Sequence, residues 1–249
     1  MMTAVPVSTI SRIAQPEAET LAAGENRRVA ELLRSLAPDD WSKQTDCPLW
    51  DVRAMAGHVV GATETFTSLP RVMKAMRAAT KEAGDGMVVD AMTARQVRER
   101  AGLTTDELIA RLEAAGPKQA RWRSHRALMR RAPMKQPMPD GTVETWKLGY
   151  LFDIILTRDP WMHRVDICQA TGREMVLTAD HDGRIIADVV AEWAQRHGQP
   201  FTLHLTGPAG GTFTAGDGGE IIELDAVEFC RILSGRATGE GLLTQEVPF

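Results

Sequence analysis

The spacing of apolar residues changes near Gly172, so the two sides of this glycine must fold differently. Before this glycine, apolar residues recur every three or four positions, the period of a helix with one buried face. After it, "FTLHLTG" (201–207) alternates apolar with polar residues, the period of a half-buried strand. The sequence therefore predicts a helical region followed by a smaller region that combines helices and strands.

Long helices are predicted in the first region, over residues 17–36, 51–66, 104–122 and 157–172. Asp51 is the expected N-cap of the second helix, and Thr104 or Thr105 that of the third, because their side-chain oxygens can accept from free first-turn amides. Gly172 offers a left-handed stop for the fourth. "RAPMKQPMPDGT" (131–142) contains three prolines and is predicted to be a loop. Long helices joined by loops indicate a four-helix bundle.

The second region reads as a compact α+β unit. A helix over 183–198 ends at Gly198, and strands are expected over 201–207 and around a glycine-rich turn within 211–224. Asp225 and Glu228 form a capping pattern for a final helix that ends at Gly235. The predicted fold class is thus α+β, with a helical bundle over residues 1–175 and a small domain over 176–249.

Bulk properties exclude several classes of protein. The 249 residues are 43% apolar and 25% charged, as in ordinary soluble proteins. A net charge of −4 argues against a nucleic-acid partner. No run of 18 apolar residues occurs, so no membrane span is expected. The cysteines, Cys47, Cys168 and Cys230, are far apart without a CxxC spacing, which favours a reducing, cytoplasmic location.

The stretch "TRDPWMHRVDIC" (157–168) places Asp159 four residues before His163. Residues four apart on a helix have neighbouring side chains, so one carboxylate and one imidazole can converge on a single cation. His58 lies on a face of the second predicted helix that is rich in small residues, where another helix can approach. Facing helices in bundles build metal sites in this way. His58, Asp159 and His163 are therefore the predicted metal ligands.

Three protein ligands and one open position are typical of a catalytic zinc site. Asp166 lies one turn beyond His163 and either orients a ligand imidazole or pairs with Arg164 or Arg173. Pro160 is tolerated only near a helix start, so the helix is expected to begin or kink near residues 157–159. Trp161 lies off the Asp159/His163 stripe and is expected in the core.

Three segments carry a family resemblance: "LLRSLAPDDWSKQTDCPLWDVRAMAGHVVG", "LGYLFDIILTRDPWMHRVDICQATGR" and the tail "DAVEFCRILSGRATGEGLLTQEVPF". Together they resemble the mycothiol-dependent maleylpyruvate isomerase family. The resemblance implies a DinB-like four-helix bundle that binds a divalent metal, usually zinc, and a C-terminal domain similar to sterol carrier proteins. His58, Asp159 and His163 match the family's ligand positions, although its best-known member has Glu in place of Asp159.

The same resemblance implies a chemistry. The metal would activate mycothiol as co-substrate, and the thiolate would attack a small electrophile, giving isomerisation or S-transfer. An arginine of the C-terminal domain binds the substrate carboxylate in the isomerase. Arg236 is the first candidate here and Arg231 the second, and the alternative for both is a surface arginine near a helix C-terminus.

Two other functions stay open at this point. The protein could bind metal without turnover, or it could carry lipid, which would require an apolar tunnel in the C-terminal domain. For the enzyme, the nucleophile is predicted to be the exogenous thiol rather than Cys47, Cys168 or Cys230, because none of the three has a sequence context that stabilises a thiolate.

Overall fold

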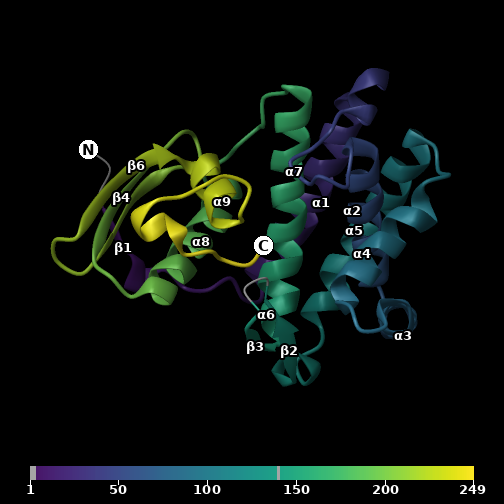
Figure 1. Ribbon diagram of the computed structural model, residues 1–249, viewed down its shortest axis with the longest axis horizontal. Helices are drawn as coiled ribbons and strands as arrows, with labels where there is room; N and C mark the ends of the chain where they lie inside the picture. Colours follow the sequence, from purple (N-terminus) through teal and green to yellow (C-terminus); the bar gives the residue numbers. More distant parts are fainter. Residues whose placement is uncertain (1–3, 139–140) are drawn as a thin grey trace. The chain divides into compact units, whose positions relative to one another are not determined.

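The computed structural model describes residues 4–138 and 141–249, and the chain forms two compact units (Figure 1). The bundle unit comprises residues 14–173. The sheet unit combines the residues up to Ile13 with residues 174–249. The predicted α+β class is confirmed.

The predicted four-helix bundle is confirmed in the bundle unit, where α1 packs against α5 and α7, and α2 packs against the same two helices. The bounds are Glu17–Ser35 for α1, Val52–Thr65 for α2, Thr105–Ser124 for α5 and Leu156–Thr171 for α7. The apolar faces meet in one core, which includes Val29, Leu33, Met55, Val59, Leu108, Leu112 and Ile167.

The helix ends follow local chemistry. The Asp51 carboxylate accepts from the Ala54 N–H at 2.7 Å and starts α2. Thr104 caps α5, with Glu107 accepting in return from the Thr104 N–H at 2.7 Å. Gly172 ends α7 with φ of 68°. Because a helix satisfies its end groups with nearby side chains, these ends could be predicted from sequence.

Pro160 lies near the start of α7, as predicted. A π-helical segment, η4 (Leu151–Ile155), and one short turn, α6 (Leu148–Tyr150), lead into the helix. Proline cannot donate a backbone hydrogen bond and crowds the preceding turn, and a wider π turn relieves that crowding.

Two features of the bundle unit were not predicted. Helices α3 (Leu69–Ala83) and α4 (Val88–Arg100) follow α2. The inward face of α4 includes polar side chains, with Gln96 only 6% and Arg100 only 8% exposed, so it lacks the apolar period that marks a buried helix.

The loop predicted over 131–142 is wrong for residues 133–137, which form a strand. Strands β2 (Pro133–Pro137) and β3 (Val143–Lys147) form an antiparallel hairpin. Each strand of an isolated hairpin has a free edge, which tolerates residues that lack an N–H. Residues 139–140 of that prediction lie outside the described residues.

The sheet unit contains α8 (Asp182–His197), β4 (Phe201–Thr206), β5 (Gly211–Ala215), β6 (Glu220–Asp225) and α9 (Ala226–Leu233). Strand β4 lies between β5, its antiparallel neighbour, and β6, its parallel neighbour. Trp193 of α8 packs against Phe201 and Phe229, with ring centroids 4.7 and 5.4 Å away, and so joins helix to sheet. Short 3-10 turns cover Val7–Thr9, Pro38–Ser42, Met129–Arg131 and Gly241–Thr244.

The N-terminal residues correct the predicted domain division. Strand β1 (Val5–Pro6) pairs in parallel with β5, and the Ile13 N–H donates to Asp188 of α8 at 2.7 Å. Residues 4–13 thus belong to the sheet unit, not to a domain over 1–175. Their pairing depends on contacts about 200 residues away in the chain, which a local pattern does not encode.

Among the described helices, none combines the length and the apolar character needed to cross a membrane.

Candidate metal centre

The predicted ligands come together in the bundle unit. His58 of α2 and His163 of α7 both point their Nε2 atoms at Asp159, at 3.5 and 3.4 Å from its Oδ1. The possible ligand atoms of all three side chains lie within 4.8 Å of one another. The i, i+4 spacing on α7 places Asp159 and His163 on one face, and the bundle brings α2 against it.

The other ring nitrogen of each histidine also has a partner. His58 Nδ1 lies 2.8 Å from Gln96 Oε1, and His163 Nδ1 lies 3.0 Å from Asp166 Oδ2. If each Nδ1 donates to its oxygen partner, each Nε2 presents a lone pair towards Asp159, as metal ligation requires.

For Asp166 the sequence allowed two roles, orienting a ligand imidazole or pairing with Arg164 or Arg173. It contacts the His163 ring, while Arg164 forms an ion pair with Glu25 at 2.7 Å and Arg173 one with Asp40 at 2.8 Å. The arginines proposed as its partners thus have other carboxylates beside them, and the geometry matches the orienting role.

The charged side chains of the cluster shift one another's pKa values. Burial disfavours the charged Asp159 carboxylate, but the adjacent His163 and His58 imidazoles outweigh burial and hold the pKa of Asp159 well below its ordinary value. Burial likewise disfavours charged His163, but the carboxylates of Asp159 and Asp166 raise the pKa of His163 to about 9. The metal-free cluster therefore holds a proton on His163 that a cation would have to displace.

Trp50 is a site residue that the sequence reasoning missed. Its ring stacks on His58, with centroids 4.8 Å apart and planes at 29°, and lies 5.9 Å from the His163 ring. The residue directly precedes the α2 N-cap, and its carbonyl accepts from Thr45 Oγ1 at 2.7 Å. An aromatic residue just before a cap is the only local signal, and it does not reveal which rings will be covered.

Cys47 lies beside the cluster, which its sequence context did not predict. Its Sγ, a ring nitrogen of His163 and a carboxylate oxygen of Asp166 all lie within 4.8 Å of one another. By contrast, burial raises the pKa of the Cys168 thiol to about 11, and Cys230 is buried in the sheet unit. Cys47 is therefore the cysteine that a test of the nucleophile must address.

The donor set fits a divalent metal. Two imidazole nitrogens and one carboxylate oxygen are a ligand combination of catalytic zinc sites, which keep a further position for substrate or water. The Asp159 side chain retains 25% of its exposure, while those of His58 and His163 retain 5% and 7%. The two imidazoles are thus largely shielded from solvent, whereas the Asp159 carboxylate is partly exposed to it.

The family described as mycothiol maleylpyruvate isomerase N-terminal domain matches residues 22–168, a range that contains all three clustered side chains. The chain belongs to this family. The match spans more than half of the sequence and coincides with most of the bundle unit.

Solved structures of the family are similar in fold. A crystal structure of the mycothiol-dependent maleylpyruvate isomerase is 17% identical, with a TM-score of 0.53 over 99% of this chain and 98% of that one. A crystal structure of a single-substitution mutant of that isomerase is 16% identical, with a TM-score of 0.53 over 95% and 93% of the two chains. At these identities the likeness supports the fold alone. Comparison with curated proteins gave no match.

The predicted substrate arginines lie in the sheet unit. Arg231 is in the last turn of α9 and forms an ion pair with Glu228 at 2.5 Å. The Arg236 backbone N–H donates to the Arg231 carbonyl at 2.9 Å, just after Gly235 closes the helix. Their role towards a substrate stays a prediction. Trp161 of α7 is fully buried, in line with its expected place in the core.

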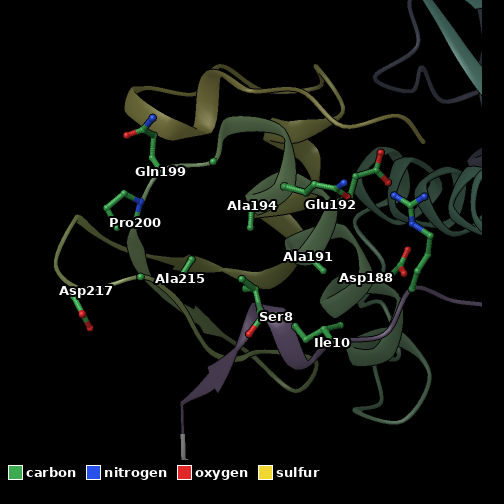
Figure 2. A pocket seen from close by; sticks show the side chains of 15 residues that line it. Ser8, Ile10, Asp188, Ala191, Glu192, Ala194, Gln199, Pro200, Ala215 and Asp217 are labelled. Atoms are coloured by element: carbon green, nitrogen blue, oxygen red, sulfur yellow. The ribbon is translucent and has the colours of Figure 1, made fainter.

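A groove of about 670 Å³ marks the sheet unit (Figure 2). Figure 2 shows Asp188 and Glu192 of α8 along it, with Ser8 and Ile10 from the N-terminal segment on another side. Asp217 lies at its far end. Its lining mixes the charged side chains of Arg12, Asp188, Glu192 and Asp217 with apolar ones such as Val7, Ile10 and Pro200, and so differs from the wholly apolar tunnel that a lipid carrier requires.

Proposed function

We propose that this protein is a metal-dependent enzyme that activates a thiol for attack on a small electrophile. The observation that carries the proposal is the convergence of His58, Asp159 and His163, with both Nε2 atoms turned towards the carboxylate. The donor set makes zinc the preferred divalent ion.

When bound, the cation supplies charge that stabilises a thiolate at neutral pH. The protein's own residues have distinct tasks around it. His58 and His163 offer neutral nitrogens, and Asp159 offers one negative oxygen. Asp166 accepts from His163 Nδ1 and orients that ring. Trp50 covers the two imidazoles and limits access of water to them.

Mycothiol is the proposed thiol, because the chain belongs to a family named for it. The thiolate either adds to a double bond, permits rotation and leaves, or displaces a leaving group and stays attached. Arg236, or else Arg231, is proposed to bind a carboxylate of the electrophile, since a guanidinium matches a carboxylate with paired donors. A cytoplasmic location, where thiols stay reduced, is part of the same proposal.

The test compares two variants for mycothiol conjugation to a panel of electrophiles, at equal folded concentration and after metal analysis. His58→Ala should abolish transfer, because two ligands rarely hold zinc in a catalytic geometry. A variant with Cys47, Cys168 and Cys230 all replaced by Ala should keep most of its activity.

Cys47→Ala alone is the matched control, because this cysteine lies beside the cluster. An inactive Cys47→Ala protein together with an active His58→Ala protein would overturn the proposal in favour of an internal nucleophile. Stoichiometric metal without turnover on any electrophile would indicate a metal-binding protein instead.

A further inference from the structure

Gln96 of α4 is buried, with 6% exposure, and its Oε1 lies 2.8 Å from His58 Nδ1. The two histidines of the cluster are thus held differently. His163 is backed by the carboxylate of Asp166 on its own helix, whereas His58 is backed by a neutral amide from another helix.

The approach of α4 to α2 is built into both helices. A Cβ atom on Gly61 of α2 would lie 2.6 Å from Gln96 Cβ, so a glycine is needed for α4 to come this close. Arg100, one turn beyond Gln96, donates to the Gln96 carbonyl at 3.0 Å and to Glu64 of α2 at 2.5 Å. Gln96 therefore reaches His58 from a backbone that is anchored on α2.

We propose that Gln96 is a positioning residue that holds His58 with its proton on Nδ1 and its Nε2 lone pair towards Asp159 and His163. This inference rests on the proposed metal function. A neutral imidazole bears one proton, and an oxygen acceptor 2.8 Å from Nδ1 keeps that proton there. In the competing arrangement Nε2 carries the proton and donates to Asp159, 3.5 Å away, and the nitrogen that faces Asp159 and His163 has no lone pair for a metal.

The Gln96 amide is neutral, so it adds no charge to the cluster. With a divalent cation bound, the carboxylates of Asp159 and Asp166 already offset its charge. A glutamine orients His58 without adding a third negative group, and so leaves the cation able to stabilise an incoming thiolate.

Three variants of the full chain test the proposal by zinc affinity, measured by competition with a chelator. Gln96→Leu removes the acceptor and should weaken zinc binding by about 10–100-fold, the usual effect of losing such an outer partner. Gln96→Glu keeps an acceptor and should restore the affinity. Gln119→Leu is the matched control, because Gln119 is a buried amide of α5 that bonds to Asn26, and its loss should leave zinc affinity unchanged.

Nitrogen NMR of His58 in the metal-free wild type gives a second, independent readout. A proton on Nδ1 is expected, alone or together with one on Nε2 that faces Asp159, and a ring with its proton on Nε2 alone would overturn the proposal even if Gln96→Leu fails to fold. Equal zinc affinity of wild type and Gln96→Leu would also overturn it. A wild type that binds no metal would refute the proposed function, while the NMR result would still decide the tautomer that Gln96 imposes.

Discussion

At the residue scale, the position of one carboxylate between two imidazoles governs the cluster. Asp159 Oδ1 lies at nearly equal distances from His58 Nε2 and His163 Nε2, 3.5 and 3.4 Å. Each charge therefore shifts the proton equilibria of its neighbours, and at the proposed metal site a proton would compete with the cation for the same nitrogen.

This competition predicts a pH dependence for metal binding. The pKa of His163 is raised to about 9, so in the metal-free protein its ring is charged at neutral pH. Its contribution to metal-free stability is fully present below its ordinary pKa of about 6.5 and is lost as the pH rises through about 9. Apparent zinc affinity should rise about tenfold per pH unit from pH ~7 to ~8.5, because one proton must leave.

Calorimetry in buffers of different ionisation enthalpy measures the proton released on zinc binding. Asp159→Asn removes the main charge that raises the pKa of His163, so the variant should bind zinc weakly and with a flatter pH profile. A wild-type affinity that does not change over this pH range would contradict the argument.

At the scale of elements, the contact between α2 and α4 decides whether Gln96 lies close enough to His58 to form a hydrogen bond with it. Two glycines of α2 face α4, and only Gly61 is needed for the close approach. A Cβ on Gly57 would meet its nearest neighbour, Arg100 Cβ, at 3.6 Å, which is an ordinary contact. A Cβ on Gly61 would lie 2.6 Å from Gln96 Cβ and 2.8 Å from Arg100 Nη1.

Gly61→Ala should therefore destabilise the protein by about 1–3 kcal/mol, because the added methyl overpacks the interface. It should also weaken zinc binding, since α4 must retreat and carry Gln96 away from His58. Gly57→Ala is the matched control, and it should be neutral or stabilise by about 0.5–1 kcal/mol, because alanine favours a helix. Urea unfolding and zinc titration of both variants measure the two effects. Equal stability of the two would show that the helices are not tightly apposed at Gly61.

At the scale of the whole molecule, the chain path is more complex than a bundle followed by a sheet. The segment up to Ile13 belongs to the unit formed by the last 76 residues, and the bundle unit lies between them in sequence. Strand β1 pairs with β5, and Arg184 of α8 donates to the Ser11 carbonyl at 2.7 Å. The sheet unit is therefore built from residues 4–13 together with residues 174–249.

Deletion of residues 1–13 should loosen the sheet unit and spare the bundle unit. Strand β5 loses one of its two neighbours, and Asp188 loses the Ile13 N–H. Hydrogen exchange should accelerate in β5 and α8, while exchange in α2 and α7 and the zinc affinity stay unchanged. Asp188→Ala is a milder comparison that keeps β1. Unchanged exchange in β5 would show that β1 adds nothing to the sheet.

Much of this protein could be predicted from the sequence because the determining interactions are local. The caps at Asp51 and Thr104 and the stop at Gly172 involve residues within one turn of each other. The pairing of Asp159 with His163 also follows from helix geometry alone. The choice of His58 as their partner used the small-residue face of its helix together with the resemblance to the family's ligand positions.

Other features depend on residues that meet only when the chain has folded. Gln96 lies on α4, whose buried face is partly polar, so no apolar period predicted this helix. Trp50 covers rings that come from two helices, and β1 pairs with a strand about 200 residues further on. Periodicity and capping report on hydrogen bonds and burial within one element, so the sequence indicated the four long helices of the bundle, the strands β4 to β6 and the three candidate ligands. Only the tertiary structure decided which side chains support those ligands, because that support comes from packing between elements distant in the chain.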